Sequence, residues 1–499
     1  MTSFLLRNVR PVELVPGTGH GGEPVDVRVQ DEVVLEIGNG LDRPVGLPEF
    51  DAQGRWLVPG LWDQHVHLGQ WSMSSSRLDL GGTSSVAEAL DRVAERLRRD
   101  PDATVVVGWG HRPATWAEQP TVADLDAVAG SRPVVLIAGD GHHAWLGSAA
   151  LALLALPSRD GMVEETEWYA AYPRLTAMLD AAHTGPEAYL QTQQAAAALG
   201  VVGLVDLEFD ERPGAWAERS AAGGCLLRVR VGAYAGTLEE YVGLGLRRGD
   251  PLPECDPRVT MGPLKIISDG SLNTRTAWCC APYADVPGMG APNLTGAELR
   301  SLLTRASRAG LEVATHAIGD RAVGEALAAY AATGAGGSIE HAQLMTRADV
   351  PELARLGLRA SVQPAHLLDD RDLTEQCWPD RADRCFMFRS MLDAGVELAL
   401  GSDAPVAPLD PWLAIAAAVH RSADARSPWH AEQAITPREA LAASVDGLGT
   451  VHEGMPADLA LLDADPLDPS GDSADQAARL REMTVAATWV GGVVVHESW

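Results

Sequence analysis

The chain has 499 residues, 46% of them hydrophobic and 21% charged, with a formal net charge of −29. This is ordinary globular composition, and the length exceeds what one simple core can bury. The negative charge argues against nucleic acids and anionic membranes as partners, and no stretch approaches the roughly 18 apolar residues of a membrane span.

Short alternating apolar runs separated by Gly, Pro and Asp clusters occupy residues 1–58, which predicts a series of short strands. Residues 446–499 repeat this style in ADLALLDADP and TVAATWVGGVVVHESW. We therefore expect one small β-sandwich built from both ends of the chain. Residues 59–445 would form the larger domain between them.

The middle of the chain alternates strand-like segments with helical stretches rich in Ala, Leu and Arg. Such alternation predicts an α/β fold, here a (β/α)8 TIM barrel. A long gap after the first strand, about 69–190, is predicted to be an insertion with its own strand in RPVVLIAGD and a helix in VAEALDRVAERLRR. The eight candidate barrel strands are 58–66, 201–207, 226–233, 263–268, 311–316, 336–340, 358–363 and 396–402.

The first of these strands ends in VPGLWDQHVHLGQW, where His65 and His67 alternate. Alternating residues of a strand share a face, so the two imidazoles can chelate one metal ion. An HxH pattern alone is weak support for a metal site. Its place at the C-terminal end of a barrel strand strengthens it, because barrel active sites lie at that rim.

Lys265 is the only lysine of the chain, beside 38 arginines, and it lies in the apolar run GPLKIISDG of the fourth strand. A buried lysine is costly as a structural ion, so chemistry that needs an amine is the leading explanation. The two options are a Schiff base and capture of CO2 to give a metal-binding carbamate. The structural alternative is a lysine paired with a buried carboxylate.

Three further metal-ligand residues end later strands: His316 the fifth, His341 the sixth and Asp403 the eighth. A single buried histidine is usually a satisfied core group. Several histidines together with Lys265 and an aspartate at one rim are hard to attribute to packing.

These motifs resemble the amidohydrolase superfamily over nearly the whole chain. Within it they resemble the amidohydrolase-3 branch, the group of N-substituted formamide deformylase-like enzymes. Further matches are GWGHRPATW, DGHHAWLGSAAL, KIISDGSLNTRTA, THAIGDRAV, IEHAQ, SVQPAH and GSDAPV.

The resemblance implies a hydrolase that cleaves a C–N bond, such as an amide or N-formyl bond, of a small molecule. His65 and His67 would hold one divalent ion, His316 and His341 a second, and a carboxylated Lys265 would bridge the two. Asp403 would ligate the first ion and act as general base towards a water activated between the metals. Zinc is favoured, although iron or manganese also suits such ligands.

The resemblance, together with the positions of their loops, indicates eight substrate-binding candidates: Trp109, Asp140, His142, Trp145, Asp269, Arg275, Gln363 and His366. For the DGHHAW loop, a structural turn capped by Asp140 is the alternative. Glu208 and Asp210 add acidic groups near the rim, and they could favour a cationic substrate or cap a helix.

Two other functions stay open: a Schiff-base lyase or aldolase built on Lys265, and a non-catalytic binding protein derived from the barrel. A homodimer is compatible with the resemblance. The six scattered cysteines form no CxxC motif, and the N-terminus has no secretion-signal pattern. We therefore expect a cytoplasmic location.

Overall fold

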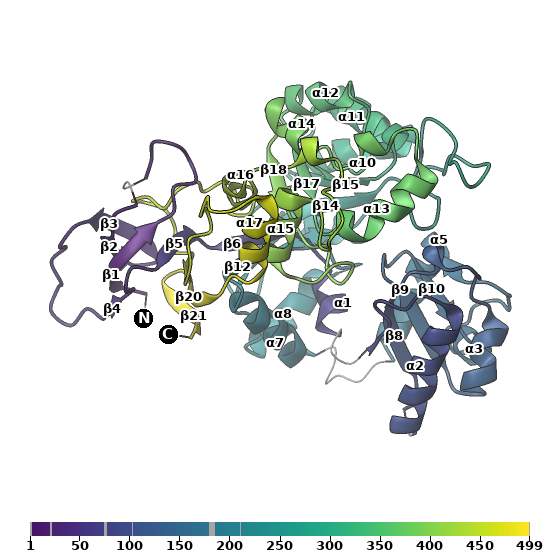
Figure 1. Ribbon diagram of the computed structural model, residues 1–499. Helices are drawn as coiled ribbons and strands as arrows, with labels where there is room; N and C mark the ends of the chain where they lie inside the picture. The colour runs from purple at the N-terminus through teal and green to yellow at the C-terminus, as the bar shows by residue number, and fades with distance from the viewer. Residues whose placement is uncertain are drawn as a thin grey trace.

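The computed structural model describes residues 2–19, 22–73, 77–101, 103–178, 185–209 and 211–498. Three parts are visible in Figure 1: a β unit that contains both termini, a central barrel with its helices, and a lobe formed by the insertion. Among the described residues, no helix is both long and apolar enough to cross a membrane.

Eight parallel strands form the barrel, in the order β18-β17-β16-β15-β14-β13-β12-β6. The ring is closed where Val66, at the end of the first strand, forms a parallel bridge with Ala404, just beyond the last strand, and the Asp403 N–H donates to the His65 carbonyl at 2.7 Å. The predicted TIM barrel is thus confirmed. Its strands are β6 (Leu61–Val66), β12 (Val201–Asp206), β13 (Arg228–Ala233), β14 (Val259–Ile267), β15 (Val313–Ala317), β16 (Gly337–His341), β17 (Arg359–Val362) and β18 (Leu398–Leu400).

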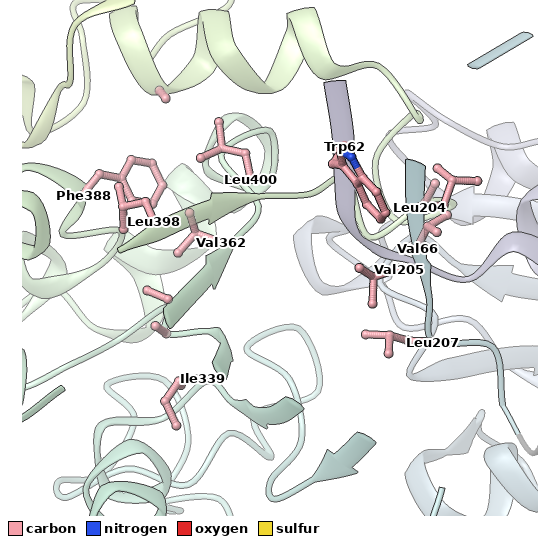
Figure 2. Close-up of a cluster of buried hydrophobic side chains, with 14 of the residues drawn as sticks. Trp62, Val66, Leu204, Val205, Leu207, Ile339, Val362, Phe388, Leu398 and Leu400 are labelled. Atoms are coloured by element: carbon pink, nitrogen blue, oxygen red, sulfur yellow. The ribbon is translucent and has the colours of Figure 1, made fainter. Parts of the chain in front are cut away.

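Helices pack around these strands and form the main hydrophobic core with them. Figure 2 shows part of this core, with Phe388 beside Leu398 on one side of the barrel and Trp62 beside Leu204 on the other. The helices that follow the barrel strands are α1 (Leu68–Ser72), α7 (Pro186–Ala197), α8 (Pro213–Ala221), α9 (Leu238–Gly243), α10 (Gly296–Arg308), α11 (Asp320–Thr333), α12 (Asp349–Arg355), α13 (His366–Cys377), α14 (Phe388–Asp393), α15 (Pro411–His420) and α16 (Pro437–Ala442).

The insertion forms a lobe around a five-stranded sheet in the order β11-β10-β9-β8-β7. It has two hydrophobic cores of its own, one on each side of this sheet's central strands. The predicted insertion with its own strand and helix is therefore confirmed. Its elements are β7 (Leu78–Asp79), α2 (Val86–Arg99), β8 (Val106–His111), α3 (Val122–Ala129), β9 (Val134–Ala138), β10 (His143–Leu146), α4 (Ser148–Leu153), β11 (Val163–Glu164) and α5 (Glu165–Thr176).

Strands from both ends of the chain share one sheet, in the order β21-β20-β19-β5-β1-β2-β3, with β4 also pairing with β1. The sheet curls around its own core, because Phe4 of β1 stacks on Trp489 of β20 at 5.5 Å between ring centroids. A second β unit made from both termini is thus confirmed. Its elements are β1 (Phe4–Pro11), β2 (Val25–Gln30), β3 (Val33–Gly38), β4 (Glu49–Asp51), β5 (Trp56–Pro59), β19 (Leu459–Leu462), α17 (Ser473–Arg481), β20 (Val485–Val490) and β21 (Val493–Glu497).

Candidate metal centre

The six residues predicted as metal ligands meet at the C-terminal end of the barrel. Each is buried, and all six line one cavity of about 420 Å³. They come from five strands or the residues directly after them: His65 and His67 from β6, Lys265 from β14, His316 from β15, His341 from β16, and Asp403 after β18. Neighbouring parallel strands bring these side chains together although up to 338 positions separate them in sequence.

Asp403 lies at the centre of the ligand cluster. Its Oδ1 atom is 3.4 Å from His65 Nε2 and 3.3 Å from His67 Nε2. One donor atom from each of these three residues lies within 4.8 Å of the others, which is compatible with ligation of a single ion. A second such group contains Asp403 with His341 and His366.

This group differs from the predicted second set, which contained His316 and His341 with a bridging carboxylated Lys265 and left Asp403 to the first ion. The His316 ring lies close to His341, with 4.5 Å between ring centroids. Its Nε2 atom faces the Gly270 carbonyl at 3.4 Å and Asp269 Oδ1 at 3.6 Å. Only Nδ1 of His316 is therefore left to face a metal ion.

Two of the ligand residues have left-handed backbone conformations. The φ angles are 69° at His341 and 58° at Asp403, values uncommon outside glycine. Side chains on a regular strand alternate, but here Glu340 faces the barrel interior and the next residue, His341, lines the metal cavity. Backbone strain of this kind tends to concentrate at functional sites.

The electrostatics of the cluster suit a metal centre. Burial lowers the pKa values of His65, His316 and His341, so these imidazoles are neutral and can donate lone pairs. Burial alone would raise the pKa of Asp403, but the neighbouring histidines hold it well below its ordinary value. Burial lowers the pKa of Lys265 to about 8, which brings its amine closer to the neutral form.

Three of the predicted substrate-binding residues, Trp109, Asp140 and His142, belong to the lobe and line the metal cavity. His366 lines an adjoining part of the same cleft, beside Arg112 and Asn273. Here the lobe contacts the loops at the C-terminal end of the barrel.

Hydrogen bonds make this connection. Trp109 Nε1 donates to the Pro405 carbonyl at 3.0 Å, and Ser271 Oγ donates to Asp140 Oδ2 at 3.0 Å. The DGHHAW loop therefore lies at the wall of the cavity, where its predicted contact with a substrate could form.

Gln363 and Asp269 lie behind the ligands and do not line the cavity. Gln363 Nε2 is 3.5 Å from His65 Nδ1. Asp269 accepts hydrogen bonds from the N–H groups of Trp278, Ile318 and Gly319. The contacts of Asp269 position the loops after β14 and β15.

Two predicted substrate contacts, Trp145 and Arg275, are not among the residues that line the cavity. Trp145 is fully buried in a lobe core, where its indole N–H donates to the Thr121 carbonyl at 2.7 Å. Arg275 pairs with Asp285 at 2.7 Å and does not line the cavity. Residue type alone did not reveal these local partners.

Glu208 caps the short helix α1. Its Oε2 atom accepts from the Gln70 N–H at 2.8 Å, and its Oε1 atom accepts from the Phe209 N–H at 3.1 Å. The capping interpretation therefore explains its position. Asp210 lies outside the described residues.

Several site residues were not found from the sequence. Tyr169 and Phe209 line the cavity, with Tyr169 Oη 2.6 Å from His142 Nδ1 and the Phe209 ring stacked on His67 at 4.9 Å. Glu165 Oε2 is 3.1 Å from His142 Nδ1, and Glu340 Oε2 is 2.7 Å from His65 Nδ1. Only Glu340 had a sequence signal, as a carboxylate inside the otherwise apolar strand before His341.

Comparisons with known proteins agree with this site. Residues 49–496 match the amidohydrolase-3 family model, described as "Amidohydrolase family". The chain is 26% identical to N-substituted formamide deformylase of Arthrobacter pascens over 90% of each sequence. It is 28% identical to YtcJ of Bacillus subtilis, covering 94% of this chain and 96% of that one.

A solved structure has the same architecture. It is that of an uncharacterized metal-dependent hydrolase from Pyrococcus horikoshii. It matches with a TM-score of 0.77 and 26% identity, over 93% of this chain and 98% of its own.

Proposed function

Because the chain belongs to the amidohydrolase family and is a hydrolase, we propose that it cleaves a C–N bond of a small amide or N-formyl compound with the help of divalent metal ions. The observation that carries this proposal is the meeting of six buried ligand-type side chains around one cavity. The similarity to an N-substituted formamide deformylase favours N-formyl compounds as the first substrates to test.

The donor set fits divalent ions. Neutral imidazoles and an ionised carboxylate are the ligands that zinc prefers. His65, His67 and Asp403 would hold one ion, and His341 with His316 or His366 a second. A carboxylated Lys265 would add an anionic oxygen ligand between them. When bound, the ions would polarise the substrate carbonyl and activate water.

The chain's own groups would move the proton and orient the substrate. Asp403 stays ionised among the histidines, so it can accept a proton from the attacking water and pass it to the leaving nitrogen. His142 points into the cavity from the lobe and can donate a hydrogen bond to the substrate. Trp109, Tyr169 and Phe209 supply apolar walls that limit access of bulk water.

A Schiff-base enzyme built on Lys265 is less well supported. Lys265 Nζ lies 2.9 Å from His65 Nε2, inside the ligand cluster. A Schiff base does not need four histidines and an aspartate around the amine.

Amine release from a panel of N-formyl and N-acyl amines, after supply of zinc and bicarbonate, tests the proposal. We expect Asp403→Asn to lose about 10²- to 10⁴-fold in kcat. Lys265→Arg should be inactive because a guanidinium cannot form the carbamate. Arg275→Gln, which alters a residue outside the cavity, should keep its activity.

Full activity of Lys265→Arg would contradict the proposal. A borohydride-trapped adduct on Lys265 with a carbonyl compound would point to the Schiff-base reaction instead.

A further inference from the structure

Glu340 lies directly behind the metal ligand His65, on the side of the ring away from the cavity. Its Oε2 atom is 2.7 Å from His65 Nδ1, and both residues are 1% exposed. A carboxylate this deeply buried is costly unless its oxygens are satisfied. None of the sequence motifs assigned it a role.

The neighbours of His65 determine which ring nitrogen carries the proton. Lys265 Nζ is 2.9 Å from His65 Nε2, and the N–H groups of this amine can donate to that nitrogen whether or not the amine is charged. An ionised carboxylate can only accept, so Nδ1 must donate to Glu340. The two shortest contacts of the ring, at 2.7 and 2.9 Å, are therefore satisfied by one tautomer, with the proton on Nδ1 and a free lone pair on Nε2. Asp403 Oδ1 and Gln363 Nε2 lie farther from the ring, at 3.4 and 3.5 Å.

We propose that Glu340 is a positioning residue that fixes His65 in this tautomer, so that its Nε2 lone pair faces the metal cavity before any ion arrives. Lys265 occupies that lone pair in the metal-free arrangement. A histidine ligand held by a carboxylate in this way is better oriented and more basic. The inference rests on the proposed metal-dependent function.

Other contacts hold Glu340 in place. Ser338 Oγ donates to Glu340 Oε1 at 2.5 Å, so both carboxylate oxygens are engaged. Ser338 lies two positions earlier on β16, on the same face of the strand. The carboxylate is therefore a fixed acceptor and not a mobile side chain.

The barrel interior below Glu340 is polar. A cavity of about 460 Å³ extends there, lined among others by Gln64, Ser338, Ser361 and Glu312. Among the described residues, the buried Ser361 Oγ has no hydrogen-bond partner. Glu312 lines the same cavity but pairs with Arg248 at 2.6 Å and Arg359 at 3.1 Å, and it makes no contact with His65. It therefore offers a matched control carboxylate.

The test compares Glu340→Gln, Glu340→Asp and Glu312→Gln with the unaltered full chain. Nitrogen NMR of metal-free, ¹⁵N-histidine-labelled protein reports the tautomer of each ring, and the His65 signals are assigned by their loss in His65→Asn. Zinc affinity is measured by competition with a chromophoric chelator. Unfolding of the metal-free variants shows whether each is folded.

We expect Glu340→Gln to bind zinc about 10- to 100-fold more weakly and to lose the single Nδ1–H tautomer of His65. Glu340→Asp, which keeps the charge, should recover part of the affinity and the tautomer. Glu312→Gln should change neither quantity. If Glu340→Gln does not fold, Ser338→Ala replaces it, with a smaller loss of affinity expected in the same direction.

Unchanged zinc affinity and an unchanged His65 tautomer in Glu340→Gln, or in Ser338→Ala if that variant takes its place, would overturn the inference. Equal losses in Glu312→Gln would also overturn it, because they would indicate a general effect of removing a carboxylate from the barrel interior. An unaltered protein that binds zinc but hydrolyses no amide would contradict the proposed reaction only, since neither readout of the inference depends on turnover.

Discussion

At the scale of single residues, the wall of the cavity contains an ion pair within the lobe, His142 with Glu165, whose carboxylate also bonds to the loop after β14. Burial opposes protonation of His142, but the adjacent Glu165 raises its pKa from 6.5 to about 9. Glu165 is fixed in turn by hydroxyl donors, Thr274 Oγ1 at 2.8 Å and Thr276 Oγ1 at 2.7 Å. The pair therefore holds a cation over the cavity and ties helix α5 to the loop after β14.

The pH dependence of stability tests this pair. Because the pKa of His142 is raised in the folded state, protonated His142 stabilises the protein fully below its unfolded pKa of 6.5. This stabilisation is lost as the pH rises through the folded pKa of about 9. The pKa of Glu165 is lower in the folded state than its unfolded value of 4.5. Its contribution to stability is therefore present above pH 4.5 and is lost as the pH falls through the folded pKa. We expect Glu165→Gln to reduce the free energy of unfolding by on the order of 2 kcal/mol at pH 7 and by much less at pH 10.

Urea unfolding at the two pH values measures this difference. Glu167→Gln is the matched control, because Glu167 lies on the same helix and pairs with Arg159 away from the cavity. Its effect should be small and similar at both pH values. An effect of Glu165→Gln that does not shrink at pH 10 would contradict the ion-pair account.

Some of the individual site residues could be predicted from the sequence and others could not. His65, His67, Lys265 and Asp403 were predicted because each is a ligand-type residue at the end of an apolar strand. Tyr169 and Phe209 were missed because they reach the cavity through packing between lobe and barrel, which leaves no local pattern. Trp145 and Arg275 are satisfied by local partners, Thr121 and Asp285, and a motif alone does not reveal such partners.

At the scale of elements, the barrel strands follow the predicted segments closely. Strand β12 begins at Val201 as predicted, and the predicted helix over 86–99 is α2 (Val86–Arg99). These elements follow directly from buried apolar runs and from helical periodicity. The left-handed residues that end β16 and precede Ala404 could not be predicted, because the surrounding loops impose them.

Close packing between β6 and β12 gives a test at this scale. The indole of Trp62 lies over Gly203, and a Cβ added there would come within 2.3 Å of the ring. We expect Gly203→Ala to lower the free energy of unfolding by about 1–3 kcal/mol, because the core must shift to accommodate the methyl group.

Thermal unfolding of Gly203→Ala against Gly214→Ala checks this expectation. Gly214 is in helix α8, and a Cβ there meets nothing within 4 Å. That control should be neutral or slightly stabilising, because alanine favours the helix. Equal stability of the two variants would contradict the packing described for β12.

At the scale of the whole molecule, the site depends on parts that are distant in sequence. The barrel supplies the ligand-type side chains and the lobe supplies Trp109, Asp140, His142 and Tyr169 as walls. The terminal sheet is anchored to the barrel through Asp458, which pairs with Arg228 of β13 at 2.5 Å. The architecture was predictable from the alternation of strand-like and helical segments. The position of the lobe over the rim of the barrel was not, since it depends on a few hydrogen bonds such as that from Trp109 to Pro405.

The metal content of the full chain, purified without chelators or a histidine tag, tests the central claim most directly. We predict about two zinc ions per chain for the unaltered protein, because the ligand cluster offers donors for a two-metal site. The matched variant Arg275→Gln should bind the same amount, whereas Lys265→Arg should bind less. A folded protein that contains no divalent metal and takes none up on reconstitution would contradict the account.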